Sequence, residues 1–402
     1  MKSEWKECTI ADLGKIITGK TPSTKNREYW NGSVMFVTPK DIQSTKHILN
    51  TERYISEHGK IKMSGCILPE NAICVSCIGN IGYIGITTQE CISNQQINSI
   101  IVNENNDIDF VYYLLKSLWL YFKHCEGQST AVSILNKTQF SQIKVKIPTI
   151  KIQKKIASIL SALDDKIELN NLINKNLEEQ AKTIFKSWFL EFEQFGGVMP
   201  YNITNIPLSN LCSIITKGTT PTTFGKKFTE NGINFIKAES ILDNHSFDTG
   251  KFAHIDEQTN NILKRSIIKS GDILFTIAGT LGRFAIVDEN IIPANTNQAV
   301  AIIRANKEII SPEYLYSFFI GNWHNNYYKK RVQQSVQANL SLTTIKSLPI
   351  TILNKEDINK YTQIITPLFK RMKINEAENQ RLSALRDALL PKLMNGEVTF
   401  KI

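Results

Sequence analysis

The sequence repeats itself, and this internal repeat constrains the fold more than any other feature. The phrase "LGKIITGKTPST", which starts at Leu13, returns with one inserted residue as "LCSIITKGTTPTT" from Leu211. "FVTPKDI" at residues 36–42 returns as "FIKAESI" at residues 235–241, and the offset between copies drifts from 198 to 205 along the chain. The repeat predicts two homologous halves, each long enough to form its own core.

Each half combines strands with helices. It opens with about 150 residues of short β-branched runs broken by glycine and asparagine, which is typical of strands and turns. Helical segments are predicted near residues 111–123 and 312–331, and a long helix ends each half. The predicted fold class is α+β, with two repeated mixed α/β domains that are each followed by a long helix.

The two long helices carry the most regular pattern. Apolar residues and paired asparagines alternate in steps of three and four, which is the a/d seam of a coiled coil. The first seam consists of Leu160, Leu163, Ile167, Asn170, Asn174, Leu177, Ala181, Ile184 and Trp188. The second consists of Ile365, Leu368, Met372, Asn375, Asn379, Leu382, Arg386 and Leu389. A heptad stripe is not buried by its own small domain, so the two stripes are predicted to bury each other.

Composition points to a polyanionic partner. The 402 residues carry a formal net charge of +10, although many surface lysines serve solubility alone. The N-terminus lacks a signal-peptide run, and the most apolar stretch, residues 111–122, is too short to span a bilayer. Seven cysteines without disulfide spacing fit a reducing compartment, so we expect a cytoplasmic protein without membrane contact.

The stretch "GKIITGKT" (Gly14–Thr21) matches the phosphate-binding pattern G-x-x-x-x-G-K-[ST]. Such a loop must wrap a phosphate with free N–H groups and lead into a helix. Here two isoleucines fill the arch, Pro22 follows directly, and the Gly-Lys-Thr triplet is absent from the second copy. The sequence favours a strand followed by a Thr-Pro turn over a P-loop that uses Lys20 and Thr21.

Cys74 and Cys77 form a C-x-x-C pair inside the strand-like run "NAICVSCIGNIGYIGI". Residues three apart on a strand face opposite sides, and no second pair completes a metal site. The pattern therefore favours two buried thiols over a zinc site or a redox pair.

The two Thr-Pro turns offer hydroxyls, amides and lysines to phosphates, the alternative being ordinary surface turns. The candidate residues are Thr18, Lys20, Thr21, Lys25, Thr216, Lys217, Thr219, Lys226 and Lys227. Two G-x-x-G stretches can also bring the backbone close to a phosphate, although glycine is as often needed for a hairpin or bulge. The candidates there are Gly79, Asn80, Gly82, Gly279, Thr280 and Gly282. The basic and aromatic stretch Tyr327–Arg331 is favoured as a helix end.

These segments, in this order and twice over, resemble the specificity subunit of type I restriction-modification enzymes. Further matching pieces are "STAVSILNKTQFSQIKVKIP" with "SVQANLSLTTIKSLPI", and "IQKKIASILSALDDKI" with "INKYTQIITPLFKRMK". The resemblance covers nearly the whole chain and implies two target recognition domains separated by two long helices, which form an antiparallel coiled coil with pseudo-two-fold symmetry. The expected segments are recognition domain 1 at residues 1–147, helical spacer 1 at 148–194, a linker at 195–207, recognition domain 2 at 208–351 and helical spacer 2 at 352–396.

The resemblance also implies a function. Each recognition domain is expected to read one half of a split site in double-stranded DNA. The helices are expected to dock methyltransferase subunits for adenine methylation, and restriction and translocase subunits are expected to cleave unmodified DNA. The chain itself would be non-catalytic and hold no cofactor or metal, while its partner chains would use S-adenosylmethionine, ATP and magnesium. Two alternatives stay open, a stand-alone DNA-binding regulator with two modules and the P-loop nucleotidase.

The offset of 205 between the helices fixes which residues face each other in a two-fold related antiparallel pair. Aligning the asparagines sets Asn170 against Asn379 and Asn174 against Asn375. The same alignment makes six further layers, and in five of them an apolar residue faces an apolar residue. Buried asparagines can fix a register at a cost in stability. Arg386 is the mismatch and is expected to extend outward. A proline at position 367 predicts that the second helix starts shortly before it or kinks there.

Overall fold

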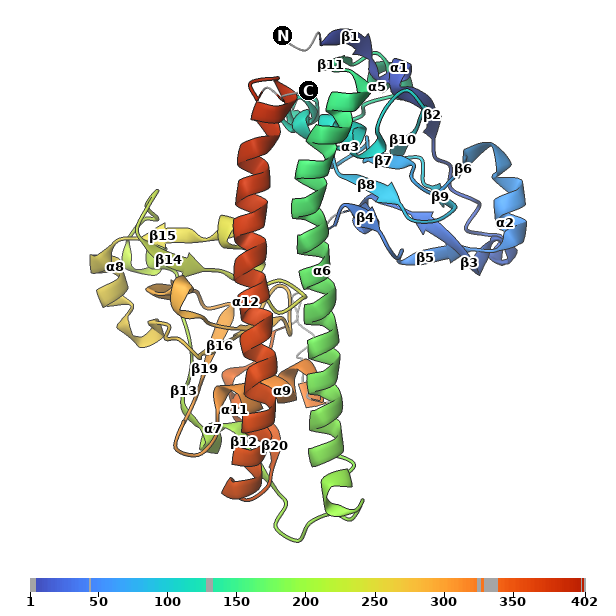
Figure 1. Ribbon diagram of the computed structural model, residues 1–402. Coiled ribbons are helices and arrows are strands. Elements are labelled where there is room, and N and C mark those ends of the chain that lie inside the picture. Colours follow the sequence, from blue (N-terminus) through green and yellow to red (C-terminus); the bar gives the residue numbers. More distant parts are fainter. Residues whose placement is uncertain are drawn as a thin grey trace. The chain divides into compact units, whose positions relative to one another are not determined.

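The computed structural model describes residues 5–42, 45–127, 133–323, 327–328, 339–398 and 400. The chain divides into two compact units. Unit 1 comprises Met1–Leu172 with Asn375–Ile402, and unit 2 comprises Ile173–Ile374. Each unit therefore contains part of both long helices, α6 (Ile150–Phe189) and α12 (Lys355–Met394) (Figure 1).

Three sheets form the β part of unit 1 (Figure 1). The strand orders are β2-β10-β7-β8-β4, β5-β3-β9-β6 and β1-β11. Neighbours are antiparallel except for the parallel pairs β3–β9 and β4–β8. The strands are β1 (Lys6–Thr9), β2 (Gly14–Thr18), β3 (Trp30–Val37), β4 (His47–Ile48), β5 (Arg53–Ile55), β6 (Ile67–Leu68), β7 (Ile73–Ser76), β8 (Ile84–Thr87), β9 (Cys91–Ser93), β10 (Ile97–Val102) and β11 (Lys144–Ile147).

The sheets of unit 2 repeat this topology, with one strand fewer in each of the two larger sheets. The strand orders are β13-β19-β16-β17, β15-β14-β18 and β12-β20, and β14 again pairs in parallel with β18. The strands are β12 (Thr204–Pro207), β13 (Cys212–Lys217), β14 (Ile233–Ile236), β15 (Ala253–Ile255), β16 (Ile273–Thr276), β17 (Phe284–Ile286), β18 (Ala294–Thr296), β19 (Val300–Ala305) and β20 (Pro349–Ile352). The predicted duplication of a mixed α/β domain is confirmed. The segment expected as a linker, residues 195–207, contains β12, which pairs with β20.

Short helices complete each domain. They are α1 (Ile10–Leu13), α2 (Glu57–Lys62), α3 (Ile108–Ser117), α4 (Trp119–Gly127) and α5 (Lys137–Ser141) in unit 1, and α7 (Leu208–Leu211), α8 (Glu257–Ile262), α9 (Pro312–Ile320) and α11 (Leu342–Lys346) in unit 2. α3 and α9 begin with side-chain caps, because Asp107 and Ser311 accept hydrogen bonds from backbone amides three residues later. Both helices bury aromatic and aliphatic residues against the sheet of their own unit.

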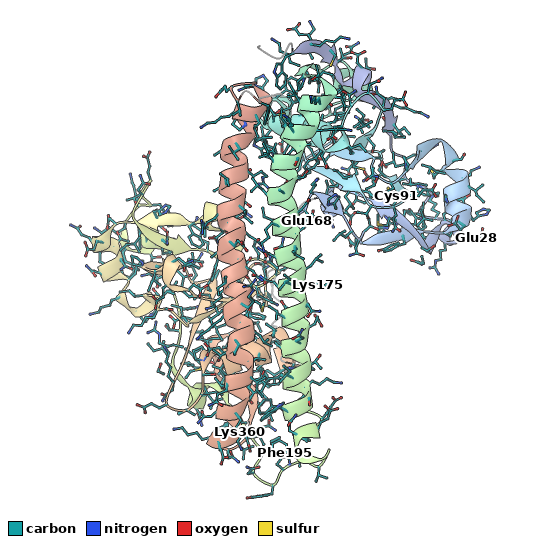
Figure 2. All side chains as sticks on the ribbon, viewed as in Figure 1. Glu28, Cys91, Glu168, Lys175, Phe195 and Lys360 are labelled. Carbon is teal, nitrogen blue, oxygen red and sulfur yellow. The ribbon has the colours of Figure 1, made fainter. Side chains whose placement is uncertain are left out.

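The C-x-x-C pair is two buried thiols, as favoured from the sequence. Cys74 packs with Met35 and Cys91 on one face of the sheet, whereas Cys77 belongs to the cluster around Phe110 on the other face (Figure 2 labels Cys91). Burial raises the pKa of both thiols to about 12. They therefore remain protonated and unreactive at neutral pH.

The long helices pair antiparallel within each unit. In unit 1, Leu160 from the first half of α6 shares a core cluster with Leu390 from the end of α12. In unit 2, Ala181 near the end of α6 shares a cluster with Met372 from the first half of α12. Pro367 lies inside α12, well after the helix starts at Lys355. The prediction that this helix starts shortly before the proline is therefore wrong. Its exposed position lets water bind the carbonyl that the proline ring leaves without a partner.

Asn170 and Asn379 face each other as the repeat predicts, whereas the pairing of Asn174 with Asn375 stays a prediction. Asn170 is fully buried, and its Nδ2 donates to Asn379 Oδ1 at 2.9 Å. Asn379 Nδ2 donates in turn to Asn171 Oδ1 at 2.9 Å, and Asn170 Nδ2 also lies 2.8 Å from Glu378 Oε2. In unit 2, Asn174 Nδ2 donates to a backbone carbonyl of α12 at 3.1 Å.

Arg386 does not extend into solvent, so that prediction was wrong. Its side chain is only 15% exposed, and Nη1 lies 2.6 Å from Asp164 Oδ1. The opposite oxygen of Asp164 accepts a hydrogen bond from the Tyr113 hydroxyl at 2.7 Å. The buried carboxylate of Asp164 therefore offers the guanidinium a stronger partner than water, while the neighbouring Leu385 is exposed instead.

The long helices contact the domain of each unit through side chains of several kinds. In unit 1, apolar packing is joined by polar contacts: Lys46 Nζ lies 2.9 Å from Asp109 of α3 and from Ser161 of α6, and His47 lies 2.8 Å from Glu168, which Figure 2 labels on α6. Lys46 and Glu168 line a cavity of about 550 Å³. In unit 2, Lys373 of α12 forms an ion pair with Asp288, and an aromatic cluster has ring centroids 4.8–6.2 Å apart; its members are Phe185, Trp188, Phe189, Tyr314 and Tyr361.

Candidate nucleic-acid interface

Four strand ends meet at one end of the five-stranded sheet of unit 1. β2 and β7 end there, and their antiparallel neighbours β10 and β8 begin there. The Thr-Pro turn after β2 and the Gly79–Gly82 turn between β7 and β8 therefore lie at the same end of the sheet (Figure 1). One strand separates β2 from β7, so the bases of the two turns are about 10 Å apart.

Unit 2 has the same arrangement, because β13 and β16 end where β19 and β17 begin. We call these two places the sheet ends. The structure gathers most of the predicted contact residues at them. In unit 1 these are Thr18, Lys20, Thr21, Gly79, Asn80 and Gly82; in unit 2 they are Thr216, Lys217, Thr219, Gly279, Thr280 and Gly282. Lys25, Lys226 and Lys227 lie farther along the loops that follow the Thr-Pro turns.

The P-loop interpretation of Gly14–Thr21 is wrong. Residues Gly14–Thr18 are strand β2, and no helix of the described chain starts at Thr21. The amide of Gly19 donates to the Ile97 carbonyl at 3.0 Å, and the amide of Lys20 donates to the Ser93 carbonyl at 2.9 Å. Since a phosphate-binding loop needs these donors free, the segment cannot cradle a nucleotide phosphate.

Gly19, which completes the phosphate-binding pattern, is required because the turn lies very close to the backbone of a neighbouring segment. A Cβ on Gly19 would lie 2.2 Å from the Asn94 carbonyl oxygen, and one on Gly218 would lie 1.7 Å from the Thr296 carbonyl oxygen. Only glycine fits where a turn presses this closely on a neighbouring strand. Both halves therefore need a glycine here for packing, and the phosphate pattern arose by chance.

Each Thr-Pro turn is tied to a glutamine that the sequence reasoning missed as a site residue. Thr21 Oγ1 donates to Gln95 Oε1, and Thr220 Oγ1 donates to Gln298 Oε1 at 2.5 Å. Both glutamines are exposed, and accepting through oxygen leaves the amide NH₂ of each side chain as a donor. The recurrence of Asn-Gln at both places is the sequence signal that could have identified them.

The glycines of the G-x-x-G turns are required by the backbone. Gly79, Gly82, Gly279 and Gly282 have φ angles of +76°, +95°, +77° and +85°, a region that other residues rarely adopt. Gly82 is also buried, and its amide donates to the Ser76 carbonyl at 2.9 Å. The hairpin interpretation therefore accounts for these glycines, and their role as DNA contacts stays a prediction.

The polar residues around the sheet ends are accessible. Asn80 and Thr280, at the tips of the G-x-x-G turns, are exposed, as are Lys20, Lys25, Lys217 and Lys227; Lys226 is partly exposed. Of the basic and aromatic stretch Tyr327–Arg331, the last three residues lie outside the described residues. The accessible groups are hydroxyl, amide and ammonium donors, which suit phosphate oxygens and base edges.

Arg265 is a further cation that the sequence reasoning missed. It is exposed, and its Nη2 lies 3.4 Å from both the Lys217 carbonyl oxygen and Thr219 Oγ1, at the sheet end of unit 2. The repeat gives no hint of it, because the equivalent position in the first half is Gly65.

Comparison with known proteins gives one family. The family model described as "Type I restriction modification DNA specificity domain" matches residues 2–179 and again residues 200–384. The chain is 27% identical to the MjaIX specificity subunit of a type I restriction enzyme from Methanocaldococcus jannaschii, over 98% of this chain and 94% of that protein. It is 36% identical to the HindI specificity subunit from Haemophilus influenzae, over 44% of this chain and 39% of that protein.

A solved structure has a similar fold. The crystal structure of the S subunit of a type I restriction-modification system from M. genitalium superposes with a TM-score of 0.58 at 15% sequence identity, covering 99% of this chain and 97% of that one. In the described part of the present chain, no helix is long and apolar enough to cross a membrane.

Proposed function

The chain belongs to the type I restriction-modification DNA specificity family, and we propose that each of its sheet ends reads one half of a bipartite DNA site. DNA sequence recognition is the function of this subunit. Double-stranded DNA is the proposed ligand, and the net charge of +10 supports binding to a polyanion.

The duplicated sheet end is the observation that carries this proposal. Both units place a Thr–Gln pair and a G-x-x-G turn at equivalent positions, and exposed lysines lie near both sheet ends, although not at matching positions. The two domains are expected to bind different half-sites. Features that both domains share therefore suit the part of DNA that is the same at every site, namely the phosphate backbone. The common residues thus position each domain on the duplex, and residues that differ between the halves read the bases.

The paired helices carry the partner subunits in this proposal. Exposed apolar residues recur at the offset of 205: Ile159 and Ile364 are 39% and 44% exposed, and Leu169 and Ile374 are 51% and 58% exposed. Two equivalent apolar surfaces suit two copies of one partner. We assign them to methyltransferase subunits that modify adenine, with restriction and translocase subunits joining the complex.

Catalysis belongs to those partner chains, which would supply S-adenosylmethionine, ATP and magnesium chemistry, while this chain acts without a cofactor of its own. The backbone hydrogen bonds of Gly19 and Lys20 support this division, because the one segment with a nucleotide-binding pattern has its amides occupied. Position and sequence choice are what this chain contributes.

Salt dependence of binding tests the phosphate contacts. Changing Lys226 and Lys227 to glutamate should weaken binding of the complex to all duplex sequences alike and lower the slope of log affinity against log salt by about 2. Lys307→Glu is the matched control, because this exposed lysine follows β19 at the opposite end of the same sheet. A slope that falls equally in the control, or does not fall at all, would contradict the assignment.

Binding measurements with and without the partner subunits distinguish this function from that of a stand-alone regulator. That alternative requires the purified chain to bind its specific site as tightly alone as with methyltransferase subunits. The proposal requires the partner subunits for methylation of a defined bipartite motif.

A further inference from the structure

The two sheet ends differ at one exposed position that the fold makes equivalent. A short 3₁₀ turn follows α2 in unit 1 (Ser64–Cys66) and α8 in unit 2 (Lys264–Ser266). Its middle residue is Gly65 in the first half and Arg265 in the second. A Cβ on Gly65 would meet nothing within 4 Å, so the first half leaves this space open.

The structure holds the arginine at the sheet end. Arg265 Nη2 makes two long contacts of 3.4 Å, to the carbonyl of Lys217 and the hydroxyl of Thr219. Nε and Nη1 of the guanidinium provide three further N–H donors. These long contacts orient the side chain toward the Thr-Pro turn and leave most of its donors for a ligand.

A buried polar network holds the backbone under Arg265. Ser266 Oγ donates to Asn295 Oδ1 at 2.7 Å, Asn295 Nδ2 donates to Asn260 Oδ1 at 2.8 Å, and all three residues are buried. The equivalent positions of Ser266 and Asn295 in the first half are Cys66 and Ile92, which pack in an apolar cluster. Directional hydrogen bonds fix a backbone more tightly than apolar contacts do. A side chain that reads a base needs a rigid backbone of this kind.

From these observations we infer that Arg265 is a specificity-determining residue that reads a guanine in the half-site bound by the second domain. This inference rests on the proposed function. Guanine presents O6 and N7 side by side in the major groove, and a guanidinium matches both acceptors at once. Arg265 is suited to this role because it belongs to one half only, whereas the Thr–Gln pairs belong to both and cannot distinguish the half-sites.

Mapping of methylated adenines tests this inference in cells that produce the full chain with its methyltransferase subunits. Arg265→Ala should leave the first half-site unchanged and relax the second at one base pair, with discrimination of guanine falling about 5- to 150-fold. Arg265→Lys keeps the charge but loses the planar pair of donors, so it should relax the same base pair. Lys264→Ala removes the neighbouring exposed charge from the same turn and should leave the motif unchanged.

Binding of the purified complexes to randomised duplexes separates a base contact from a phosphate contact. If Arg265 contacts a phosphate, Arg265→Ala should weaken binding to every duplex and leave the motif intact, and Arg265→Lys should keep most of the affinity. That result overturns the inference. An unchanged motif in both Arg265 variants overturns it as well. Loss of all methylation in both Arg265 variants, while Lys264→Ala stays active, also contradicts the inference. Removing one base contact should relax the motif at one base pair and should not abolish methylation at every site. If the wild-type complex methylates no defined motif, the proposed function itself fails.

Discussion

At the scale of single residues, Asp164 is the centre of the ionic contacts in unit 1. Its side chain is 5% exposed, and it is bound by the Tyr113 hydroxyl at 2.7 Å and by Arg386 at 2.6 Å. Lys116 Nζ lies farther away, at 4.0 Å. A buried carboxylate with these partners is stable only as long as its close cation remains.

Removing that cation should be costly. Arg386→Leu should lower the free energy of unfolding by about 3–5 kcal/mol, because it leaves Asp164 charged and buried. The double variant Arg386→Leu/Asp164→Leu should recover most of this loss, since an apolar pair replaces both charges. Arg381→Leu, an exposed arginine on the same helix, is the control and should change stability by less than about 0.5 kcal/mol. Urea denaturation measures all three, and a single variant as stable as the wild type would disprove the role of the ion pair.

The pair His47 and Glu168 should make the stability of unit 1 depend on pH. The hydrogen bond to Glu168 raises the pKa of His47 above its ordinary value of 6.5, outweighing burial and the nearby Lys46. Burial alone would raise the pKa of Glu168, but the hydrogen bonds from His47 lower it on balance below 4.5. The stabilisation from His47 is therefore complete below about pH 6.5 and is lost as pH rises through its higher folded pKa, whereas that from Glu168 is lost only in acid.

His47→Gln keeps a hydrogen-bonding group without the charge. The melting temperature of the wild type should exceed that of this variant by about 2–4 °C at pH 6 and by less at pH 9. His58→Gln replaces an exposed histidine that stacks on Tyr29 and is the control for the histidine-to-glutamine change itself. Equal differences for His47→Gln at both pH values would show that its charge does not stabilise the fold.

At the scale of elements, the helix pair is where sequence reasoning reached furthest. The heptad pattern and the offset of 205 together place Asn170 against Asn379, and these side chains share a hydrogen bond. Such a layer is predictable because it depends only on period and repeat. Arg386 was not predictable in the same way, because its partner Asp164 is held in place by Tyr113 of α3, which the heptad pattern does not contain.

The asparagine layer should trade stability for register. Asn379→Leu alone should cost about 1–3 kcal/mol, because it leaves the buried Asn170 amide with one partner fewer. Changing both Asn170 and Asn379 to leucine should raise the melting temperature above that of the wild type. Amide hydrogen exchange in α12 should nevertheless become faster, because an apolar layer no longer penalises a shifted register. A double variant with lower stability than the single one would contradict this account.

The sheet ends show where sequence reasoning stops. The strand and turn after Leu13 were predictable, because the repeat outweighed the accidental phosphate-binding pattern. The hydrogen bond from Thr21 to Gln95 was not, since it joins residues 74 positions apart. Arg265 was hidden for the opposite reason: a repeat reveals what the halves share, and this residue belongs to one half only.

At the scale of the whole molecule, the chain is one domain plan used twice with different side chains. The strand orders recur, and so do the glycines at positive φ and the Thr–Gln pairs, whereas Arg265 of the second half and the aromatic cluster around Phe185 belong to unit 2. Shared features suit contacts that both halves must make, and the differences leave each half free to recognise its own sequence. Independent reading by two halves is therefore the central claim.

Exchange of one domain tests this claim most directly. Residues 1–147 are replaced by the matching segment of a related specificity subunit, with Lys46, His47 and Tyr113 retained so that their polar contacts with α6 are kept. The hybrid is produced with its methyltransferase subunits, and methylated adenines are mapped across the genome. We expect a motif in which one half matches the donor and the other half is unchanged. A motif in which both halves change, or neither does, would contradict this claim.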